Sequence, residues 1–519
     1  MKKHNIIKVV LITMLVFLLL SWILPAAYYS GQFVDQGRVQ MGLFDLFNYQ
    51  LTALSYFGYI GLFFILVGGF YGILYKIPAY RTFLERIVKL FEGKEKILLS
   101  IMVVVIALLV SVCGIQFGIA LFIPFIISLI LLMGYDKITA ALVTVGGAIA
   151  GLIGTTYAVN NTGILTATLA LDADFEIGIR WAILLVSVAL VIFNVLMYAK
   201  IKKSKVEVIK EEVKEKIEKV EKAVAKKVEV KKAAVKKTST KKAPLKKTVK
   251  TVKKGKSANK AALIEEDVII VPAKVNGNHK IWPLVLTFSL LFVLFVLAFL
   301  PWSVFKVDAF EKATLAVQEF TIFKFPIFAK ILGTFNPFGN WTMTDLFLPM
   351  GVVILVLALI YKVKLDDILD GFIEGVKKAL APFAIVILLY SILVLVTYHP
   401  FQLVIYKSIL GLTKGFNIAT TVVVALLAPI FNSDIAYSFQ SVIPYYTSIV
   451  TKTTNYPLVG VIFQSMYGVV MLFAPTSLVL MSILAYLKVS YKDWLKTIWK
   501  LLLELFVVLL IIFIILALI

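Results

Sequence analysis

The sequence has very few of the residues that build disulfides and metal centres. Its 519 residues include a single cysteine, Cys113, so no intrachain disulfide can form. The three histidines, His4, His279 and His399, are far apart in the sequence and offer too few ligands for a zinc or haem site. The chain also lacks a G-x-x-x-x-G-K-[ST] phosphate loop, which would bind ATP. We therefore expect no cofactor and no enzymatic activity. Any energy-requiring process would have to use a gradient across a membrane or a separate partner protein.

Charged residues are scarce as well, at 16% of the chain, whereas 61% of the residues are hydrophobic. Soluble globular proteins are about 45–50% apolar, so this composition excludes the water-soluble classes. At about 20 residues per membrane-spanning helix, the chain has room for roughly ten crossings. We predict an all-α polytopic protein of the cell membrane with ten to eleven apolar segments. The apolar runs are 9–24, 55–75, 97–133, 138–170, 178–199, 281–303, 346–361, 380–397, 416–450, 458–487 and 498–519.

The formal net charge of +23 belongs mainly to one segment. Between Lys200 and Lys260 the chain holds 24 lysines and 7 glutamates. This segment divides the protein into an N-terminal membrane half (1–199), a Lys-rich insert (200–280) and a C-terminal membrane half (281–519). Apolar residues at helical spacing from Val206 to Val228 predict a helix in the first part of the insert. The remainder, rich in Lys, Ala and Thr, is predicted to be disordered.

Two interpretations of the insert stay open, a solvated linker held near anionic lipid headgroups and a tether for nucleic acid or a partner protein. No aromatic residue lies between the lysines, which disfavours single-strand stacking and makes nucleic acid the weaker partner. The excess of Lys and Arg in short loops places the N-terminus, the loop 76–96 and the insert in the cytoplasm. The amphipathic segment 362–378 is placed on that same side.

Polar residues interrupt three of the apolar runs. In hydrocarbon a helix can break only where protein or a watery cavity satisfies the freed backbone groups, so such breaks are candidate solute sites. Breaks in both halves are typical of secondary transporters. The alternatives are a glycine-rich packing interface around Gly147, Gly151 and Gly154, and a simple kink at Pro475. The candidate substrate-binding residues are Thr155, Thr156, Asn160, Asn161, Asn432, Ser433, Asp434, Ser438, Thr476 and Ser477.

Asp434 is the clearest candidate for a carboxylate inside the membrane. Because a buried carboxylate is costly in hydrocarbon, it is by default a functional hypothesis. It could bind a cation, carry a proton or meet a cationic substrate. The alternative is that Asp434 caps a helix beginning at Ile435.

Short motifs in both halves resemble a known family. They are Gly68–Leu74, Gly93–Lys96, Gly134–Asp136, Phe372–Gly375, Pro475–Met481 and Tyr491–Lys496. In this order they are similar to YfcC-like carriers, which belong with the C4-dicarboxylate anaerobic carriers in the ion transporter superfamily. The resemblance implies inverted repeats with re-entrant hairpins, a homodimer, and gradient-driven transport of small organic ions such as dicarboxylates or amino acids.

The chain departs from this family at the expected binding tips. The segment Gly154–Asn161 keeps a pair of hydroxyls but lacks the family's Asn-Pro, and Ser433–Ser438 replaces P-S-G-S-G-Q. Met466–Met471 replaces G-D-G-F-T-N, and apolar residues near Leu121 replace an acidic pair. The resemblance therefore implies the scaffold and leaves the substrate, the coupling ion and even substrate binding open.

These observations predict a secondary active transporter of a small amino acid or carboxylate that works by alternating access. The ends of unwound helices would present backbone amides to a substrate carboxylate, and Asp434 would face a cationic group or a coupling ion, Na⁺ or H⁺. Two rivals remain. One is a non-transporting scaffold that tethers nucleic acid or a partner through the insert, and the other is a passive channel.

Overall fold

The membrane domain is built almost entirely from helices, together with one small hairpin. The computed structural model describes residues 5–115, 117–199, 279–333 and 335–518. Residues 1–196 and 272–519 form one unit, and the description below concerns that unit. The Lys-rich insert, with its predicted helix and predicted disorder, lies outside the described residues except for His279 and Lys280.

The elements of the N-terminal half follow one another closely. They are α1 (Asn5–Ile23), β1 (Ala26–Tyr29), β2 (Phe33–Gly37), α2 (Leu43–Lys76), α3 (Pro78–Leu90), α4 (Glu95–Cys113), η1 (Gly118–Leu121), α5 (Ile123–Leu132), α6 (Lys137–Ile153) and α7 (Val159–Leu169). The apolar helix Ile177–Ala199 ends this half. The antiparallel pair β1–β2 is the one sheet in the described part of the chain.

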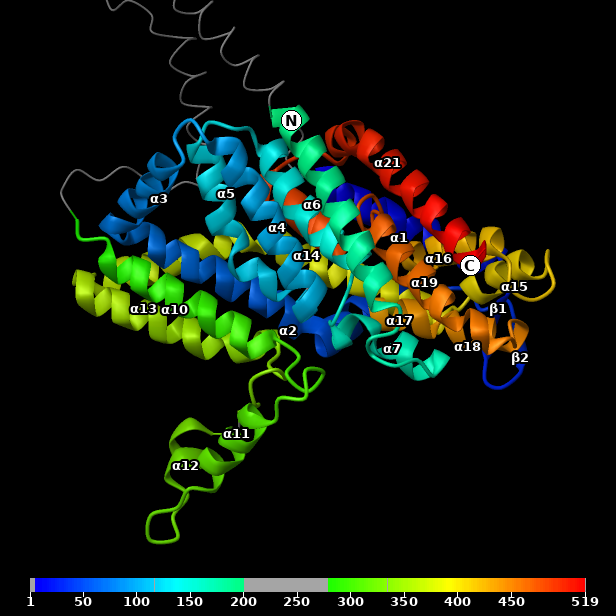
Figure 1. Cartoon of the computed structure of the whole chain (residues 1–519), viewed down its shortest axis with the longest axis horizontal. Coiled ribbons are helices and arrows are strands. Elements are labelled where there is room, and N and C mark those ends of the chain that lie inside the picture. The colour runs from blue at the N-terminus through cyan, green and yellow to red at the C-terminus, as the bar shows by residue number, and fades with distance from the viewer. Residues whose placement is uncertain (1–4, 116, 200–278, 334, 519) are drawn as a thin grey trace, which may run out of the picture. The chain divides into compact units, whose positions relative to one another are not determined.

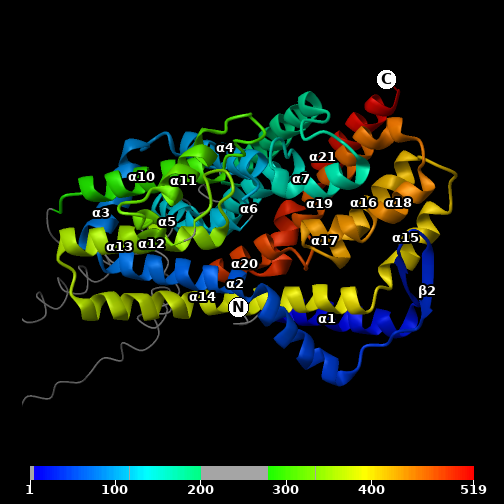
Figure 2. The ribbon, with the colours of Figure 1, turned by 90° about the horizontal axis from the view of Figure 1, so that it is seen from below.

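The C-terminal half contains more elements. They are α10 (Trp282–Phe299), α11 (Ala309–Glu319), α12 (Ile327–Leu332), η2 (Met343–Leu346), α13 (Phe347–Tyr361), α14 (Leu365–Tyr398), α15 (Gln402–Leu410), α16 (Ile418–Phe431), α17 (Ile435–Gln440), α18 (Ile443–Ile449), η3 (Thr453–Asn455), α19 (Tyr456–Met471), α20 (Leu478–Leu487) and α21 (Tyr491–Leu518). Figures 1 and 2 show α10 and α13 side by side.

Eight described helices are long and apolar enough to cross a membrane. This confirms the prediction of an all-α polytopic membrane protein. The shorter helices α5, α6, α16 and α20 are also apolar, although each is below the length of a full crossing. They are pieces of the long apolar runs in the sequence, which the structure divides.

The two halves repeat one order of elements. Each has a 34-residue helix (α2; α14), a short helix (α3; α15), a helix that ends at a break (α4; α16), and a second helix that ends at a break (α6; α19). Each half then closes with a short helix (α7; α20) and a long apolar helix (Ile177–Ala199; α21). The repeated order, with α2 and α14 antiparallel to each other as described next, is the arrangement that an inverted repeat requires.

The helices α2 and α14 cross at glycines, and this crossing joins the halves. A Cβ atom built on Gly68 would lie 2.7 Å from the carbonyl oxygen of Gly375, and one on Gly371 would lie 2.8 Å from that of Gly72. The backbones are therefore in direct contact, as small residues four positions apart permit in membrane helices. Gly68 meets Gly375 and Gly72 meets Gly371, so the residue numbers at the contact rise along α2 while they fall along α14. The two helices are therefore antiparallel.

The same geometry explains the charged ends of these helices. Lys76 at the end of α2 forms an ion pair of 3.1 Å with Glu374 near the start of α14. The segment 76–96 thus begins beside 362–378, at one end of the domain. The counterpart of α3 in the repeat is α15, and the segment 362–378 belongs to α14 itself.

Breaks divide four of the long apolar runs. The helix α4 ends at Gly114, whose φ of +69° suits glycine, and α6 ends at Gly154. Asn432 ends α16 shortly after Pro429, and Pro475 lies between α19 and α20. The prediction that the run 138–170 unwinds in its middle is confirmed, and the predicted close packing holds, because a Cβ on Gly151 would lie 2.5 Å from the carbonyl oxygen of Ala107.

Candidate functional site

The α6–α7 break exposes a row of backbone carbonyls, and side chains from other helices bind all of them. The five consecutive carbonyl oxygens from Leu152 to Thr156 each accept at least one side-chain hydrogen bond. The donors are Gln464 Nε2 to Leu152 (3.0 Å), Ser465 Oγ to Ile153 (3.3 Å), Ser111 Oγ to Gly154 (2.6 Å), Arg180 Nε to Thr155 (2.8 Å) and Arg180 Nη2 to Thr156. An unpaired carbonyl in hydrocarbon costs several kcal/mol, so these donors are what permits the break.

Thr155 and Thr156 are fully buried within this arrangement. The Thr155 hydroxyl donates to the carbonyl of Leu152 at 3.0 Å and accepts from Gln464 Nε2 at 3.0 Å. The Thr156 hydroxyl lies 3.0 Å from Ser111 Oγ on α4, and the Thr156 amide donates to the carbonyl of Ser111. Both hydroxyls therefore help to tie the break to α4 and α19.

The two predicted asparagines that follow differ in exposure. Asn160 is exposed at the start of α7, whereas Asn161 is buried, with 3% of its surface accessible. Asn160 also lies near the first break of this half, because a Cβ on Gly114 would be 3.4 Å from the Asn160 Cβ. The two breaks of the N-terminal half are thus neighbours.

Arg180 is the main residue of this region that the sequence argument overlooked. Its guanidinium, in a side chain only 2% exposed, donates to the carbonyls of Thr155, Thr156, Ala173 and Phe175 and lies over the Phe175 ring at 4.5 Å. The planar guanidinium provides several donors in fixed directions, which suits a cluster of carbonyls. A basic residue at the start of an apolar run was the signal that could have identified it.

The α16–α17 break carries the second group of predicted residues. Asp434 caps α17, with Oδ1 accepting from the amides of Ala436 (3.1 Å) and Tyr437 (3.3 Å). This matches the capping interpretation, and the carboxylate retains a second oxygen. That oxygen, Oδ2, accepts from the Tyr390 hydroxyl at 3.4 Å, and the half-buried side chain remains partly accessible.

Aromatic rings pack behind the Tyr390 hydroxyl that contacts Asp434. Tyr390 on α14 stacks on Phe57 of α2, with ring centroids 4.1 Å apart, and Phe57 lies 6.4 Å from Tyr437. The Asp434 carboxylate is thus a polar group beside an aromatic cluster, and its charge is the feature of this break that would attract a positively charged group.

Side chains of α19 and of the α19–α20 connection bind backbone carbonyls at and before this break. The Tyr467 hydroxyl on α19 donates to the carbonyl of Ser433 at 2.7 Å. Thr476, between α19 and α20, donates to the carbonyl of Ile430 at 3.1 Å. Ser477 is fully buried and caps α20, accepting from the amide of Leu480 at 3.4 Å. The two breaks of the C-terminal half are therefore neighbours as well.

The helix α19 connects the breaks of the two halves. Gln464 contacts the α6–α7 break and Tyr467, one turn later, contacts the α16–α17 break. Gly468 allows this packing, because a Cβ there would lie 2.6 Å from the amide nitrogen of Ile153. The structure thus brings Thr155 and Ser433 into contact with the same helix, through Gln464 and Tyr467.

Three buried polar atoms at these breaks lack a hydrogen-bond partner among the described residues. They are Asn432 Oδ1, Ser438 Oγ and Gln464 Oε1. Their side chains are 4%, 0% and 2% exposed, respectively. Since most buried polar side-chain atoms in proteins are hydrogen-bonded, such atoms need an explanation, and a ligand or a water molecule that binds there provides one.

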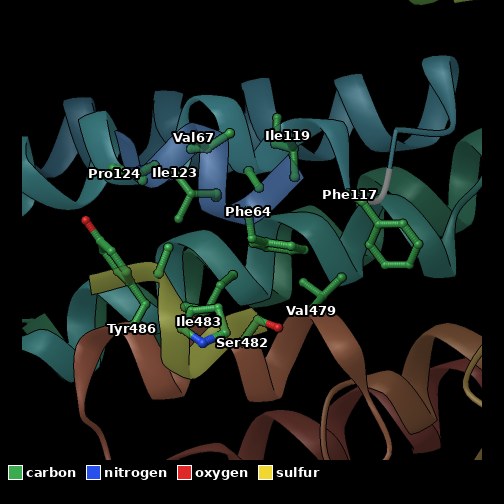
Figure 3. A pocket seen from close by; sticks show the side chains of 14 residues that line it. Phe64, Val67, Phe117, Ile119, Ile123, Pro124, Val479, Ser482, Ile483 and Tyr486 are labelled. Carbon is green, nitrogen blue, oxygen red and sulfur yellow. The ribbon is translucent and has the colours of Figure 1, made fainter. Parts of the chain in front are cut away.

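A separate cavity lies between the long helices and α20. It has a volume of about 60 Å³, and Figure 3 shows its largely apolar lining, which includes Phe64 and Val67 of α2, Ile123 of α5, and Val479 and Ser482 of α20. None of the ten predicted site residues lines it. An apolar cavity does not suit a charged solute. No cluster of three or more His, Cys, Asp or Glu that could hold a metal was found in the described ranges.

The chain was compared with curated proteins, solved structures and protein-family models. No curated protein and no solved structure gave a significant match. A family model, the C4-dicarboxylate anaerobic carrier, matches residues 4–242 and 284–518 and so covers both membrane halves. The match agrees with the resemblance of the sequence motifs and with the multi-pass helical fold. The chain therefore belongs to the C4-dicarboxylate anaerobic carrier family and is a membrane transporter.

Proposed function

We propose that this transporter is a secondary active carrier of a small organic solute bearing a carboxylate, either an amino acid or a dicarboxylate. The solute would bind where the breaks of α6, α16 and α19 meet, and the carrier would expose that site to each side of the membrane in turn. The N-terminus and the Lys76 end of α2 would face the cytoplasm, in keeping with the positive charge of the loop 76–96.

The observation that carries this proposal is the set of unpartnered polar atoms beside the breaks. Asn432 Oδ1, Ser438 Oγ and Gln464 Oε1 are buried, and a buried unpaired polar atom costs about 1–3 kcal/mol. Their bonding capacity is available to a solute, whereas Thr155 and Thr156 already bond to the protein. A site whose polar groups become paired only when a solute is present favours that solute over the empty state.

Asp434 is assigned to a positive charge in this proposal. Its second carboxylate oxygen is bonded to Tyr390 alone among the described side chains. The positive charge would be the ammonium group of an amino acid, or a coupling Na⁺ or H⁺ that accompanies a dicarboxylate.

Asp434→Asn tests this assignment without removing the helix cap, because Asn is as good as Asp at the N-cap. The purified variant should unfold at the temperature of the wild type, and its uptake of labelled amino acids and dicarboxylates into proteoliposomes should fall at least about tenfold, the equivalent of 1.4 kcal/mol. A wild-type counterflow signal, which a passive channel would not give, is measured in the same vesicles.

Asp136→Asn is the matched control. Asp136 caps α6 by accepting from the amide of Thr139 at 2.9 Å, and its replacement should leave uptake unchanged. Equal uptake by the Asp434→Asn and Asp136→Asn variants would remove Asp434 from the mechanism. Uptake under a sodium gradient or a pH gradient alone identifies the coupling ion.

The tethering hypothesis makes a different prediction about the insert. Deletion of Lys200–Lys260 should leave solute uptake intact if the membrane domain is the carrier. Loss of cellular function with unchanged uptake by the purified deletion variant would instead favour a tether.

A further inference from the structure

The connection between α10 and α13 forms a lobe that the transport proposal does not use. We call the described residues 303–333 and 335–342 the α10–α13 lobe; it contains α11 and α12. Figure 1 shows it projecting away from the helices that it connects. Both α10 and α13 are candidate membrane spans that pack side by side, so the lobe begins and ends at one surface of the membrane.

The α10–α13 lobe buries very little of its apolar surface. None of the side chains of α11 is buried. Eight large apolar side chains between positions 305 and 331 are at least 40% exposed, namely Phe305, Leu315, Phe320, Ile322, Phe323, Phe325, Phe328 and Ile331. Isolated helices of this length are marginal in water, so an environment that covers these side chains would stabilise the lobe.

The tip of the lobe is a tight turn that presents an aromatic and a basic residue. Ile322 and Phe325 form an antiparallel bridge, and the two residues between them, Phe323 and Lys324, have φ angles of 50° and 62°. A bulky residue with a positive φ is strained, and such strain is concentrated at functional positions. The Phe323 side chain is fully exposed, with a relative accessibility of 101%.

Charge accompanies the exposed rings. Lysines at positions 306 and 312 alternate with exposed carboxylates at 308, 311 and 319, whereas the part beyond Glu319 carries two exposed lysines, Lys324 and Lys330, and no acidic residue up to Ile331. Tryptophans lie at its two ends, where Trp302 donates to the carbonyl of Leu297 and Trp341 to that of Asn336, each at 2.8 Å. Tryptophan and tyrosine are enriched at membrane interfaces, and lysines close to the surface are attracted to anionic headgroups.

We propose that the α10–α13 lobe binds the surface of the bilayer, with Phe323 and the neighbouring rings at the boundary between the headgroups and the acyl chains and Lys324 and Lys330 at anionic phosphates. A lipid surface is the occupant because both ends of the lobe emerge from membrane spans, which keep that surface within its reach. The alternation of rings and lysines matches the apolar and anionic layers that meet at that surface.

A spin label at the tip tests the proposal in the full-length chain. Cys113, the one cysteine of the sequence, is buried, so Phe323→Cys introduces the accessible thiol. In nanodiscs containing anionic lipid, a nitroxide at position 323 should be accessible to oxygen, which partitions into lipid, and protected from a water-soluble nickel chelate. Asp366→Cys, at an exposed position in the first turn of α14, is the water-facing reference, and the unsubstituted chain measures background labelling.

The lysines provide the second measurement. Replacing Lys324 and Lys330 by Gln in the Phe323→Cys chain should lower the ratio of membrane-bound to free lobe in anionic nanodiscs about fivefold per lysine. The ratio is read from the oxygen and nickel accessibility of the label. Equal oxygen and nickel accessibility at positions 323 and 366 would overturn the proposal. Dipolar broadening between labels on two chains would also overturn it, because a second copy would then cover the lobe.

Discussion

At the α6–α7 break, all five carbonyl oxygens from Leu152 to Thr156 accept hydrogen bonds from side chains, and the threonine hydroxyls of the break are also bonded. The α16–α17 break is different. Tyr467 and Thr476 bind its carbonyls, while Asn432 and Ser438 keep polar atoms without a partner in the described chain. The carbonyls and threonine hydroxyls of the first break are therefore bonded within the protein, and Oε1 of Gln464 is the unpartnered atom beside them, whereas the second break keeps unpartnered atoms on two of its own side chains, Asn432 and Ser438.

The difference shows that polar residues within a membrane helix do not by themselves mark a solute site. The same hydroxyl or amide can satisfy a freed carbonyl or bind a ligand, and only its partners separate the two roles. Three variants test the distinction, and we expect their effects on stability to decrease in the order given.

Arg180→Met should have the largest effect. It leaves four carbonyls, among them those of Thr155 and Thr156, without their charged donor in a buried place. At about 1–3 kcal/mol for each unsatisfied group, we expect the free energy of unfolding to fall by more than about 3 kcal/mol. Denaturant unfolding in detergent and elution in gel filtration measure the loss.

Arg38→Met, at an exposed position beyond β2, is the control and should change stability by less than about 0.5 kcal/mol. If Arg180→Met were as stable as this control, the α6–α7 break would not depend on its side-chain donors, and the comparison would fail.

Ser111→Ala should have an intermediate effect. The Ser111 hydroxyl bonds to the carbonyl of Gly154 and lies 3.0 Å from the Thr156 hydroxyl. Its loss therefore removes two contacts between α4 and the α6–α7 break. We expect a loss of about 2 kcal/mol, with uptake per folded molecule retained. Ser100→Ala, which removes a bond within α4 only, should be nearly neutral. A selective loss of uptake at unchanged stability would move Ser111 from the framework to the solute site.

Ser438→Ala should have the smallest effect on stability, and of opposite sign. Removing a buried hydroxyl that has no partner should leave the free energy of unfolding unchanged or raise it by up to about 1 kcal/mol. Uptake should nevertheless fall, because the solute loses a bonding group. A variant that is destabilised and transports normally would show that Ser438 has a structural role.

Much of the fold was predictable because hydrophobic runs and helix breakers act locally. The sequence predicts a helix over 9–24, found as α1, and a break within 138–170, found between α6 and α7. It underestimates α14, whose first turns hold Asp366, Asp367 and Glu374 and so interrupt the apolar run that starts at 380. It also places 362–378 on the same side as the basic loop 76–96, and the Lys76–Glu374 ion pair brings these two segments together at one end of the domain.

The site was less predictable, because its chemistry depends on partners far away in the sequence. Thr155 and Asn432 are both polar, so the sequence treats them alike. In the structure Gln464 donates a hydrogen bond to the Thr155 hydroxyl, whereas Oδ1 of Asn432 has no partner among the described residues. Arg180 bonds to carbonyls 24 and 25 residues away, and Ser111 to one 43 residues away. Sequence spacing contains no information about such pairings, which arise only when the helices pack.

The glycine crossing of α2 and α14 restricts how this carrier can move. Gly68, Gly72, Gly371 and Gly375 bring carbonyl oxygens of one helix against the backbone of the other, with no side chains between them to change rotamer. Any change in the angle between α2 and α14 at that point would have to alter this backbone contact itself. We therefore expect the pair to stay together during a transport cycle, and we expect the moving parts to be the shorter, interrupted helices around it.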